Sequence, residues 1–336
     1  MTPAGGADGR PLVVILDTDF PSNEIERRVL TEAGCELRIA DCRTEADVVA
    51  AAGAADGVIV QYAPLTRRSL GGLSRCRIVT RYGIGMDNID MPAATELGVW
   101  VANVPGFCAP EVSDHGLALV LAFGRRLFAL DRSVRDGRWD VVGVAGQTRR
   151  VAESTLGIVG FGTIGRMLAT KAAGLGLRVL AHSPRSAPRL AAEHGAEAVD
   201  LTTLLRESDY VVLLCPLRPE THHLIRRETL AVMRPSAHLI NLSRGALVDE
   251  AQLARALADG RLAGAGLDVF EREPLPADSP LRRLPNVILS PHGAYYSSRA
   301  LAELQERVAR NVVDGLAGRA PGSLLNPEAR WRGASS

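Results

Sequence analysis

The segment 156–165, which reads LGIVGFGTIG, constrains the fold of this chain more than any other stretch. A short apolar run ends at Gly160, and Gly162 and Gly165 follow in the pattern G-x-G-x-x-G. Apolar residues then recur at helical spacing, so the segment predicts a strand, a glycine turn and a helix. In such a unit the first glycine permits the turn, the second lets a ligand approach the backbone, and the third lets the helix pack closely on its strand. The segment therefore predicts a dinucleotide site at the helix N-terminus.

The six-residue pattern alone is a weak signal, and a tight strand-to-helix turn without a ligand is the alternative interpretation. The flanking strand and amphipathic helix favour the dinucleotide site. We therefore predict cofactor contacts from the residues of the turn, which are Gly160, Phe161, Gly162, Thr163, Ile164 and Gly165.

Composition limits the classes of partner. The 336 residues suffice for two domains, and 39 basic against 38 acidic residues leave a net charge of +1, which indicates neither a nucleic-acid face nor an acidic tail. The five cysteines show no C-x-x-C spacing, so neither a disulfide framework nor a metal site is indicated. No apolar run reaches the ~18 residues of a membrane helix. We expect a cytoplasmic protein whose partners are small molecules.

Short apolar segments alternate with helical or polar segments in two series, which predicts two parallel sheets covered by helices. The first series of expected strands comprises residues 12–16, 36–40, 57–61, 77–80 and 99–102. The second comprises residues 156–159, 178–181, 210–214, 238–242, 263–270 and 286–289. We predict an α/β fold of two Rossmann-like doubly wound domains with a cleft between them: a flavodoxin-like substrate domain and a six-stranded NAD(P)-binding Rossmann domain.

Two long helical patterns set the expected domain boundaries. Residues 109–130 predict a helix that connects the domains, and residues 301–316 form an amphipathic pattern after the second sheet is complete. We expect this last helix to return to the first domain. The predicted substrate-binding domain is therefore discontinuous, with residues 11–106 and 294–327, and residues 107–293 form the predicted cofactor domain.

Four polar residues fall where strands of the second series end, which is where open parallel sheets bind ligands. Arg244 follows the strand 238–242, Asp268 interrupts an apolar run, Glu273 comes just after it, and His292 follows the last strand. A carboxylate among apolar residues costs several kcal/mol unless it is paired. A helix cap or a buried ion pair is the alternative for each residue alone, but their convergence beside a dinucleotide turn favours a functional site.

The chemistry of carbonyl reduction assigns roles to these residues. It needs a hydride and a proton, and histidine supplies protons near neutral pH, so His292 is the predicted acid. Glu273 would orient the imidazole and favour its charged form. The planar fork of Arg244 matches a carboxylate, which predicts a 2-oxo or 2-hydroxy acid as substrate. The adjacent His222 and His223 are expected to point to different faces and not to form a metal pair.

The motifs RYGIGMDNID, NVPGFCAPEVSDHGLAL, INLSRGALVDE, AGLDVFEREP and LSPHGAYYS span most of the chain and, with the glycine turn, resemble the D-isomer-specific 2-hydroxyacid dehydrogenases. Within that family they resemble the phosphoglycerate-dehydrogenase-like and C-terminal-binding-protein-like branch. The resemblance implies that Arg244, Glu273 and His292 are catalytic, and that Asp268 binds the nicotinamide carboxamide. It also implies a homodimer formed through the cofactor domain and the connecting helix.

The resemblance extends to further contacts. It implies that the loop of Arg81, Tyr82, Gly83, Ile84 and Gly85 holds the substrate carboxylate through backbone amides. Two glycines directly after a strand can form such an anion-binding loop, although an ordinary turn is an equal alternative from the residues alone. The remaining cofactor contacts implied are Cys215, Pro216, Thr221, Leu242, Ser243 and Gly293.

Two positions depart from the pattern of the family. Where the family often has an acidic residue after the second Rossmann strand, this chain has Ser183 and Arg185, which suit the 2′-phosphate of NADP. We therefore expect an NAD(P) enzyme with a slight preference for NADP(H). Tyr295 stands where the C-terminal-binding proteins carry tryptophan, so it is either an aromatic wall for the substrate or a packing residue of the interdomain hinge.

Two classes of function remain open from the sequence. The first is an NAD(P)-dependent dehydrogenase or reductase of a small 2-hydroxy or 2-oxo acid, with an enzyme acting on a phosphonate or another small anionic acid as a variant. The second is a corepressor-like binding protein that senses a dinucleotide. Intact Arg244, Glu273 and His292 favour the enzyme, because an adaptor needs none of them.

Overall fold

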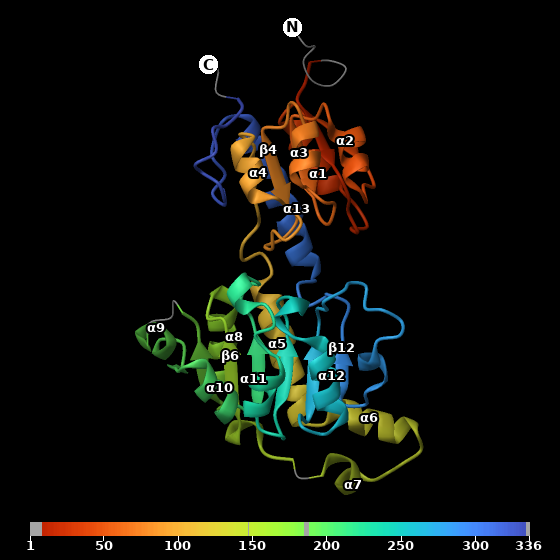
Figure 1. Ribbon diagram of the computed structural model, residues 1–336, viewed down its shortest axis with the longest axis vertical. Helices are drawn as coiled ribbons and strands as arrows, with labels where there is room; N and C mark the ends of the chain where they lie inside the picture. Colours follow the sequence, from red (N-terminus) through yellow and green to blue (C-terminus); the bar gives the residue numbers. More distant parts are fainter. Residues whose placement is uncertain (1–8, 147, 185–187, 334–336) are drawn as a thin grey trace. The chain divides into compact units, whose positions relative to one another are not determined.

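The computed structural model describes residues 9–146, 148–184 and 188–333. It divides into two compact units: unit 1 comprises Met1–Phe107 and Ser297–Ser336, and unit 2 comprises Cys108–Tyr296. Each unit contains one parallel sheet with helices (Figure 1). The predicted fold class, two α/β domains with parallel sheets, is confirmed.

The sheet of unit 1 has five parallel strands in the order β2-β1-β3-β4-β5, which is the flavodoxin-like order. These strands are β1 (Leu12–Ile15), β2 (Glu36–Ile39), β3 (Gly57–Val60), β4 (Ile78–Arg81) and β5 (Trp100–Ala102). All four residues of β1 and of β3 are buried, as expected of central strands that are covered on both faces.

Helices cover both faces of this sheet. They are α1 (Glu24–Glu32), α2 (Glu45–Ala52), α3 (Arg67–Gly72), α4 (Met91–Glu96) and α13 (Ser298–Leu316). The long helix α13 buries an apolar stripe that includes Leu304, Val308 and Val312. It packs against α1, β3 and β4, so the C-terminal helix belongs to the same unit as the N-terminal strands (Figure 1).

The sheet of unit 2 has seven parallel strands in the order β12-β11-β10-β9-β6-β7-β8. They are β6 (Thr155–Val159), β7 (Arg178–His182), β8 (Ala196–Ala198), β9 (Tyr210–Leu213), β10 (His238–Asn241), β11 (Gly264–Leu267) and β12 (Val287–Leu289). Counted from β6, the order is that of the Rossmann fold with one further strand. The sequence predicted six strands. It missed β8 because the sequence Ala-Glu-Ala contains no apolar run.

The helices of unit 2 lie on both faces of its sheet. They are α5 (Ala109–Gly124), α6 (Leu127–Arg135), α7 (Val141–Ala145), α8 (Thr163–Gly174), α9 (Pro188–Ala192), α10 (Leu201–Glu207), α11 (Arg227–Val232) and α12 (Glu250–Ala258). Helices α5 and α8 pack against each other, and α10, α11 and α12 share a core with β9, β10 and β11. Short 3-10 turns are η1 (Val151–Glu153), η2 (Pro219–Thr221), η3 (Gly245–Leu247) and η4 (Pro280–Arg283).

The predicted connecting helix over residues 109–130 is interrupted at Arg125 and Arg126, so the segment forms α5 and the start of α6. Helix α5 ends at Gly124, and Arg126 adopts a left-handed backbone with φ of 56° before α6 begins. A Cβ on Gly124 would lie 2.9 Å from the hydroxyl of Tyr210, so the helix end lies close to the sheet. The apolar period continues through the break, and for that reason the sequence pattern did not reveal it.

Candidate active site

The glycine turn between β6 and α8 has the geometry of a dinucleotide-binding turn. Gly160 has φ of 104°, and a Cβ there would lie 2.4 Å from the amide nitrogen of Cys215. A Cβ on Gly165 would lie 2.3 Å from the carbonyl oxygen of Gly160, so the helix and the strand require glycine to pack this closely. A Cβ on Gly162 would meet no atom of the described residues within 4 Å beyond its chain neighbours, which leaves the start of α8 open to an anion. The residues present therefore fit the pyrophosphate of a dinucleotide.

The exposure of the turn residues agrees with close packing at Gly165 and an open backbone at Gly162. Phe161 and Gly165 are buried, Ile164 is half-buried, and Gly162 and Thr163 are exposed at the helix start. The turn also lies where β6 borders β9, the point at which the strand order reverses. Open α/β sheets bind their ligands at such a point.

The predicted cofactor residues after β9 and β10 are linked to one another. The hydroxyl of Ser243 donates to the carbonyl of Cys215 at 2.6 Å, and the hydroxyl of Thr221 donates to the carbonyl of Pro216 at 2.8 Å. Leu242 is buried. Burial raises the pKa of the Cys215 thiol to about 11, so the thiol is neutral at neutral pH.

His292 and Glu273 form a hydrogen-bonded pair, with 2.7 Å between Nδ1 and Oε2. The other oxygen of Glu273 accepts the backbone N–H of Phe270 at 3.0 Å. Burial raises the pKa of Glu273, but the hydrogen bond and charge of His292, the Phe270 N–H and the charge of Arg244 outweigh it, so the pKa lies below its usual value. An ionised carboxylate only accepts hydrogen bonds, so Nδ1 of His292 is the donor and Nε2 is left to face a substrate.

Arg244 follows β10 by three residues and lies close enough to this pair for its charge to act on Glu273. Its guanidinium donates to the carbonyl of Ser243 at 2.7 Å, and its positive charge helps to lower the pKa of Glu273. The next residue must be glycine, since a Cβ on Gly245 would lie 1.8 Å from the carbonyl carbon of Phe270. This backbone contact joins the loop that carries Arg244 to the loop that carries Glu273.

Asp268 is 1% exposed and holds the loop that carries His292. Its carboxylate accepts the hydroxyl of Ser290 at 2.6 Å and the amides of Gly293 and Ala294 at 2.9 and 3.0 Å. Its carbonyl accepts the amide of His292 at 2.7 Å. The observed contacts of Asp268 and of the Gly293 amide are therefore internal, and their predicted contacts with the cofactor stay predictions.

Aromatic and imidazole groups complete this end of unit 2. The ring of Tyr295 is half-buried and lies edge-on to the ring of His292, with 6.5 Å between centroids. Nε2 of His115, from α5, lies 3.3 Å from the hydroxyl of Ser290. Tyr295 thus stands beside the candidate acid, and His115 contacts the residue that Asp268 binds.

The loop after β4 in unit 1 matches the predicted anion loop only in part. Arg81 is the last residue of β4, and the amide of Tyr82 donates to the carbonyl of Val60 at 2.8 Å, so this amide is not available to a substrate. Among the described residues, the amides of Gly83, Ile84 and Gly85 donate to no acceptor. Gly83 has φ of 122°, and a Cβ there would meet the guanidinium of Arg81 at 2.2 Å. The candidate anion loop is therefore the segment 83–85.

The remaining predictions concern the residues after β7 and the adjacent histidines 222 and 223. Ser183 directly follows β7 and is half-buried, whereas Arg185 lies outside the described residues. The expectation that His222 and His223 point to different faces is wrong, because their rings stack 4.0 Å apart. His223 has φ of 48°, which turns its ring toward its neighbour, and its Nε2 lies 2.8 Å from Glu271.

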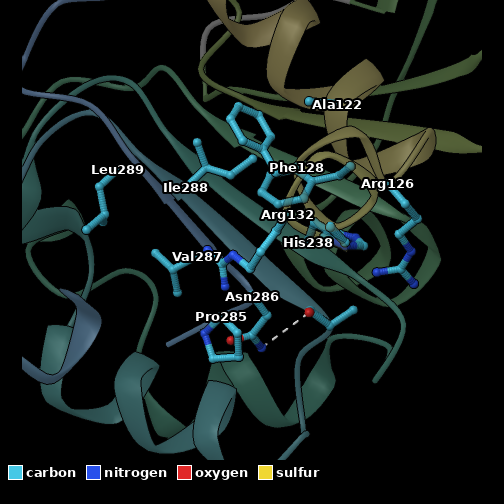
Figure 2. Close-up of a pocket in the computed structure, with 13 residues that line it drawn as sticks. Ala122, Arg126, Phe128, Arg132, His238, Pro285, Asn286, Val287, Ile288 and Leu289 are labelled. Carbon is cyan, nitrogen blue, oxygen red and sulfur yellow. Dashed lines mark hydrogen bonds between the residues drawn. The ribbon is translucent and has the colours of Figure 1, made fainter. Parts of the chain in front are cut away.

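A pocket of about 360 Å³ in unit 2 lies at the other end of the strands. His238 and Val287, which line it, are the first residues of β10 and β12, whereas Arg244 and His292 follow the ends of these strands. Figure 2 shows Phe128, Arg126, Arg132 and His238 on one side and the segment 285–289 on the other. This pocket contains none of the candidate catalytic residues.

Sequence reasoning named none of the buried carboxylates of unit 1, of which Asp17 and Glu26 hold segments that follow strand ends. Asp17, two residues after the end of β1, accepts the amides of Gln61 and Tyr62 at 3.0 and 2.6 Å. Glu26, in α1, is 0% exposed and binds Tyr82. Asp17 could have been found by the rule that polar residues at strand ends line sites, but Glu26 lies in the polar stretch NEIERR and carried no such signal.

The chain is similar to known oxidoreductases over most of its length. A family model described as D-isomer specific 2-hydroxyacid dehydrogenase, NAD binding domain, matches residues 117–294, which lie in unit 2. A glyoxylate reductase of Korarchaeum cryptofilum is 42% identical over 269 residues, or 79% of this chain and 80% of that protein.

Solved structures show the same relationship. A D-lactate dehydrogenase of Aquifex aeolicus, complexed with NAD and lactic acid, has a TM-score of 0.84 and 27% identity over 94% of this chain and 99% of that chain. An acyclic imino acid reductase in complex with NADPH and D-Arg has a TM-score of 0.83 and 25% identity over the same shares of the two chains. No helix among the described residues is long and apolar enough to cross a membrane.

Proposed function

We propose that this chain, which belongs to the D-isomer specific 2-hydroxyacid dehydrogenase family, interconverts a small 2-oxo acid and its 2-hydroxy acid with a nicotinamide cofactor. The observation that carries the proposal is the pair of His292 and Glu273 at 2.7 Å, with Arg244 beside it in the unit that holds the glycine turn. A protein that only sensed a dinucleotide would need the turn but not a histidine oriented in this way.

Each residue of the site has a role in this reaction. The bound nicotinamide supplies the hydride for reduction of the carbonyl carbon. His292 gives the proton on Nε2 to the carbonyl oxygen, and Glu273 keeps the imidazole oriented through Nδ1. Arg244 binds the carboxylate or carbonyl oxygen through its planar guanidinium. The amides of Gly83, Ile84 and Gly85 bind the substrate carboxylate.

The proposed substrate class is a small 2-oxo acid. The relatives are glyoxylate reductases, and the solved structures include a D-lactate dehydrogenase, so glyoxylate is the first substrate to test. Tyr295 lies edge-on to His292 and would form an aromatic wall at the side chain of the substrate. This wall favours 2-oxo acids with an apolar substituent over those with a charged one.

Replacement of His292 by glutamine tests the proposal. We expect the rate of glyoxylate reduction to fall about 100-fold or more, since general acid catalysis contributes about that factor. The affinity for the reduced cofactor should stay within about twofold of the wild type. The matched control is His223→Gln, because His223 also binds a carboxylate, Glu271, at 2.8 Å but lies outside the proposed site. Full activity of the His292 variant would exclude the mechanism.

For the cofactor we propose a slight preference for NADP(H). Ser183 follows β7 at the position where an acidic residue would accept the ribose hydroxyls of NAD. Ser183 and Arg185 would instead bind the 2′-phosphate, and a partly exposed arginine-phosphate pair contributes about 1 to 2 kcal/mol, or about tenfold in affinity.

We also propose that the protein is a homodimer in which α6, α7 and the segment between them contact the partner subunit. Six of the twelve exposed large apolar residues in the described part of the chain lie between residues 127 and 142. Trp139 is 92% and Val142 is 78% exposed. An apolar segment of this kind favours burial against a partner. Phe128, from the same segment, lines the pocket of Figure 2, so the surface of unit 2 around this pocket is part of the proposed dimer face.

A further inference from the structure

A buried carboxylate in unit 1 lies directly behind the candidate anion loop. Glu26 is 0% exposed and accepts the hydroxyl of Tyr82 at 2.5 Å. Tyr82 immediately precedes Gly83, the first residue of the loop. We propose that Glu26 is a positioning residue for substrate binding, which holds the amides of Gly83, Ile84 and Gly85 in place through Tyr82.

The hydrogen bonds around Glu26 join three elements. The side-chain amide of Gln305, from α13, donates to the two carboxylate oxygens at 3.1 and 3.0 Å. The side-chain amide of Asn23 donates at 3.1 Å. Gln305 also donates to the carbonyl of Ser22 at 2.6 Å. The carboxylate therefore ties the start of α1 and the middle of α13 to the residue from which the loop begins.

Neutral donors alone satisfy this carboxylate. No arginine, lysine or histidine in the described part of the chain forms an ion pair with Glu26. A buried carboxylate without a cation is costly, and it persists only where several donors are directed at it. Such a group fixes the position of its donors more strictly than an apolar contact would, because a shift of any donor leaves the charge unsatisfied.

Tyr82 transmits this constraint to the loop. Its side chain is held by Glu26 and by the ring of Phe20, which lies edge-on with 4.9 Å between centroids. Its amide is held by the carbonyl of Val60. Burial, followed by the charge of Glu26 and the hydrogen bond to it, raises the pKa of Tyr82 well above its usual value, so the phenol remains a donor at neutral pH.

The far side of the loop is fixed separately. The side chain of Asn103 donates to the carbonyl of Ile84 at 2.7 Å, and the amide of Val104 donates to the carbonyl of Gly83 at 2.9 Å. The carbonyls of Gly83 and Ile84 are thus bound by the residues after β5, and the start of the loop is fixed by the contact of Tyr82 with Glu26. The amides of the three loop residues remain as donors for a ligand. This arrangement suits a small carboxylate, which accepts several N–H bonds at once.

The inference rests on the role proposed above for this loop, and the test separates the two. We would measure the dissociation constant of oxamate, an unreactive analogue of a 2-oxo acid, for the full chain with reduced cofactor, and the KM and kcat for glyoxylate. In Tyr82→Phe we expect the dissociation constant and the KM to rise about tenfold, with kcat within about threefold of the wild type. Cofactor affinity should not change, because the glycine turn belongs to unit 2.

Two further variants separate positioning from stability. Tyr82→Phe combined with Glu26→Gln removes the hydroxyl and the buried charge together, and it keeps an amide oxygen that accepts the side-chain amides of Gln305 and Asn23. Its Tm should return toward that of the wild type while the weak binding of oxamate persists. The control is Asp56→Asn, which removes the charge of another buried carboxylate of unit 1. Asp56 precedes β3, at the end of the sheet away from Tyr82, and accepts the amide of Leu12 at 2.9 Å. This control variant should lower Tm and leave oxamate binding unchanged.

Oxamate affinity equal to that of the wild type in Tyr82→Phe, or recovered in the double variant, would overturn the positioning role. A wild-type protein that binds oxamate but turns over no 2-oxo acid, with the same tenfold loss in Tyr82→Phe, would support the positioning role and refute the proposed function.

Discussion

The interaction between Glu273 and His292 yields the sharpest prediction, which concerns the pH dependence of turnover in Glu273→Gln. The carboxylate accepts a hydrogen bond from Nδ1 at 2.7 Å and favours the charged imidazole. A glutamine that keeps the bond from the Phe270 amide turns its own N–H toward Nδ1 and opposes that charge. The neutral imidazole is therefore favoured in the variant.

The structure sets the size of this effect. A hydrogen bond to a charged group contributes about 1.5 to 3 kcal/mol, and an exposed ion pair about 0.2 to 1 kcal/mol. Both side chains are 36% exposed, so water screens the pair in part, and we take the low end of the hydrogen-bond range, about 1.5 kcal/mol. This is about one pH unit. The pH at which glyoxylate reduction falls off on the alkaline side should move about one unit lower.

Steady-state rates from about pH 5 to 9, measured with saturating cofactor, check this prediction. The matched control is Glu271→Gln, because Glu271 binds His223 at 2.8 Å with similar exposure but outside the proposed site. A pH profile of Glu273→Gln that coincides with the wild type, or that moves to higher pH, would refute the reasoning. An equal shift in Glu271→Gln would show that the change in net charge alone is responsible.

The same carboxylate also contributes to stability with a defined sign. The pKa of Glu273 is lower in the folded protein than its ordinary value of 4.5, so its contribution is present above that value and is lost as the pH falls through the folded pKa. The difference in Tm between the wild type and Glu273→Gln should therefore be seen at neutral pH and disappear in acid.

Three further predictions concern the glycine turn, the adenosine side of the cofactor site and the dimer. Gly162→Ala should keep the wild-type Tm and bind the cofactor about tenfold or more weakly, whereas Gly165→Ala should lower the free energy of unfolding by about 1 to 3 kcal/mol. Thermal melts and cofactor titrations check both variants. The same Tm in the two variants would contradict the roles assigned to these glycines. The wild-type kcat/KM should be about tenfold higher with NADPH than with NADH, and this ratio should fall about tenfold in Arg185→Ala. A wild-type preference for NADH would refute this prediction. Trp139→Ser with Val142→Ser should shift the protein from dimer to monomer in light scattering, and a wild-type monomer would exclude the proposed face.

Strand positions were predictable because central parallel strands are apolar runs that end abruptly. The expected strand 57–61 is found as β3 (Gly57–Val60), and the expected strand 178–181 as β7 (Arg178–His182). The failures have physical causes. β8 is an edge strand with no apolar run, and the break after Gly124 lies inside a continuous apolar period, where only the backbone of Arg126 reveals it.

The candidate site was predictable where its residues follow strand ends in the chain. The contact between Glu273 and His292 was expected from this rule and is present. The contact of Tyr82 with Glu26 was not, because Glu26 lies in a helix 56 positions earlier, and Gln305, which also binds Glu26, lies 279 positions after Glu26. Only packing shows that a tyrosine beside the predicted anion loop points into the core of unit 1 and not toward a ligand.

The backbone of His292 explains why we expect Glu273 to change proton affinity more than geometry. His292 has φ of 52°, a left-handed conformation that costs a non-glycine residue about 1 to 3 kcal/mol. It persists because Asp268 binds the amides of His292, Gly293 and Ala294 and the hydroxyl of Ser290. The position of the ring is therefore set first by Asp268 and only then by Glu273. Loss of the Glu273 charge should leave the imidazole near its place and alter mainly the pH range over which it carries the proton.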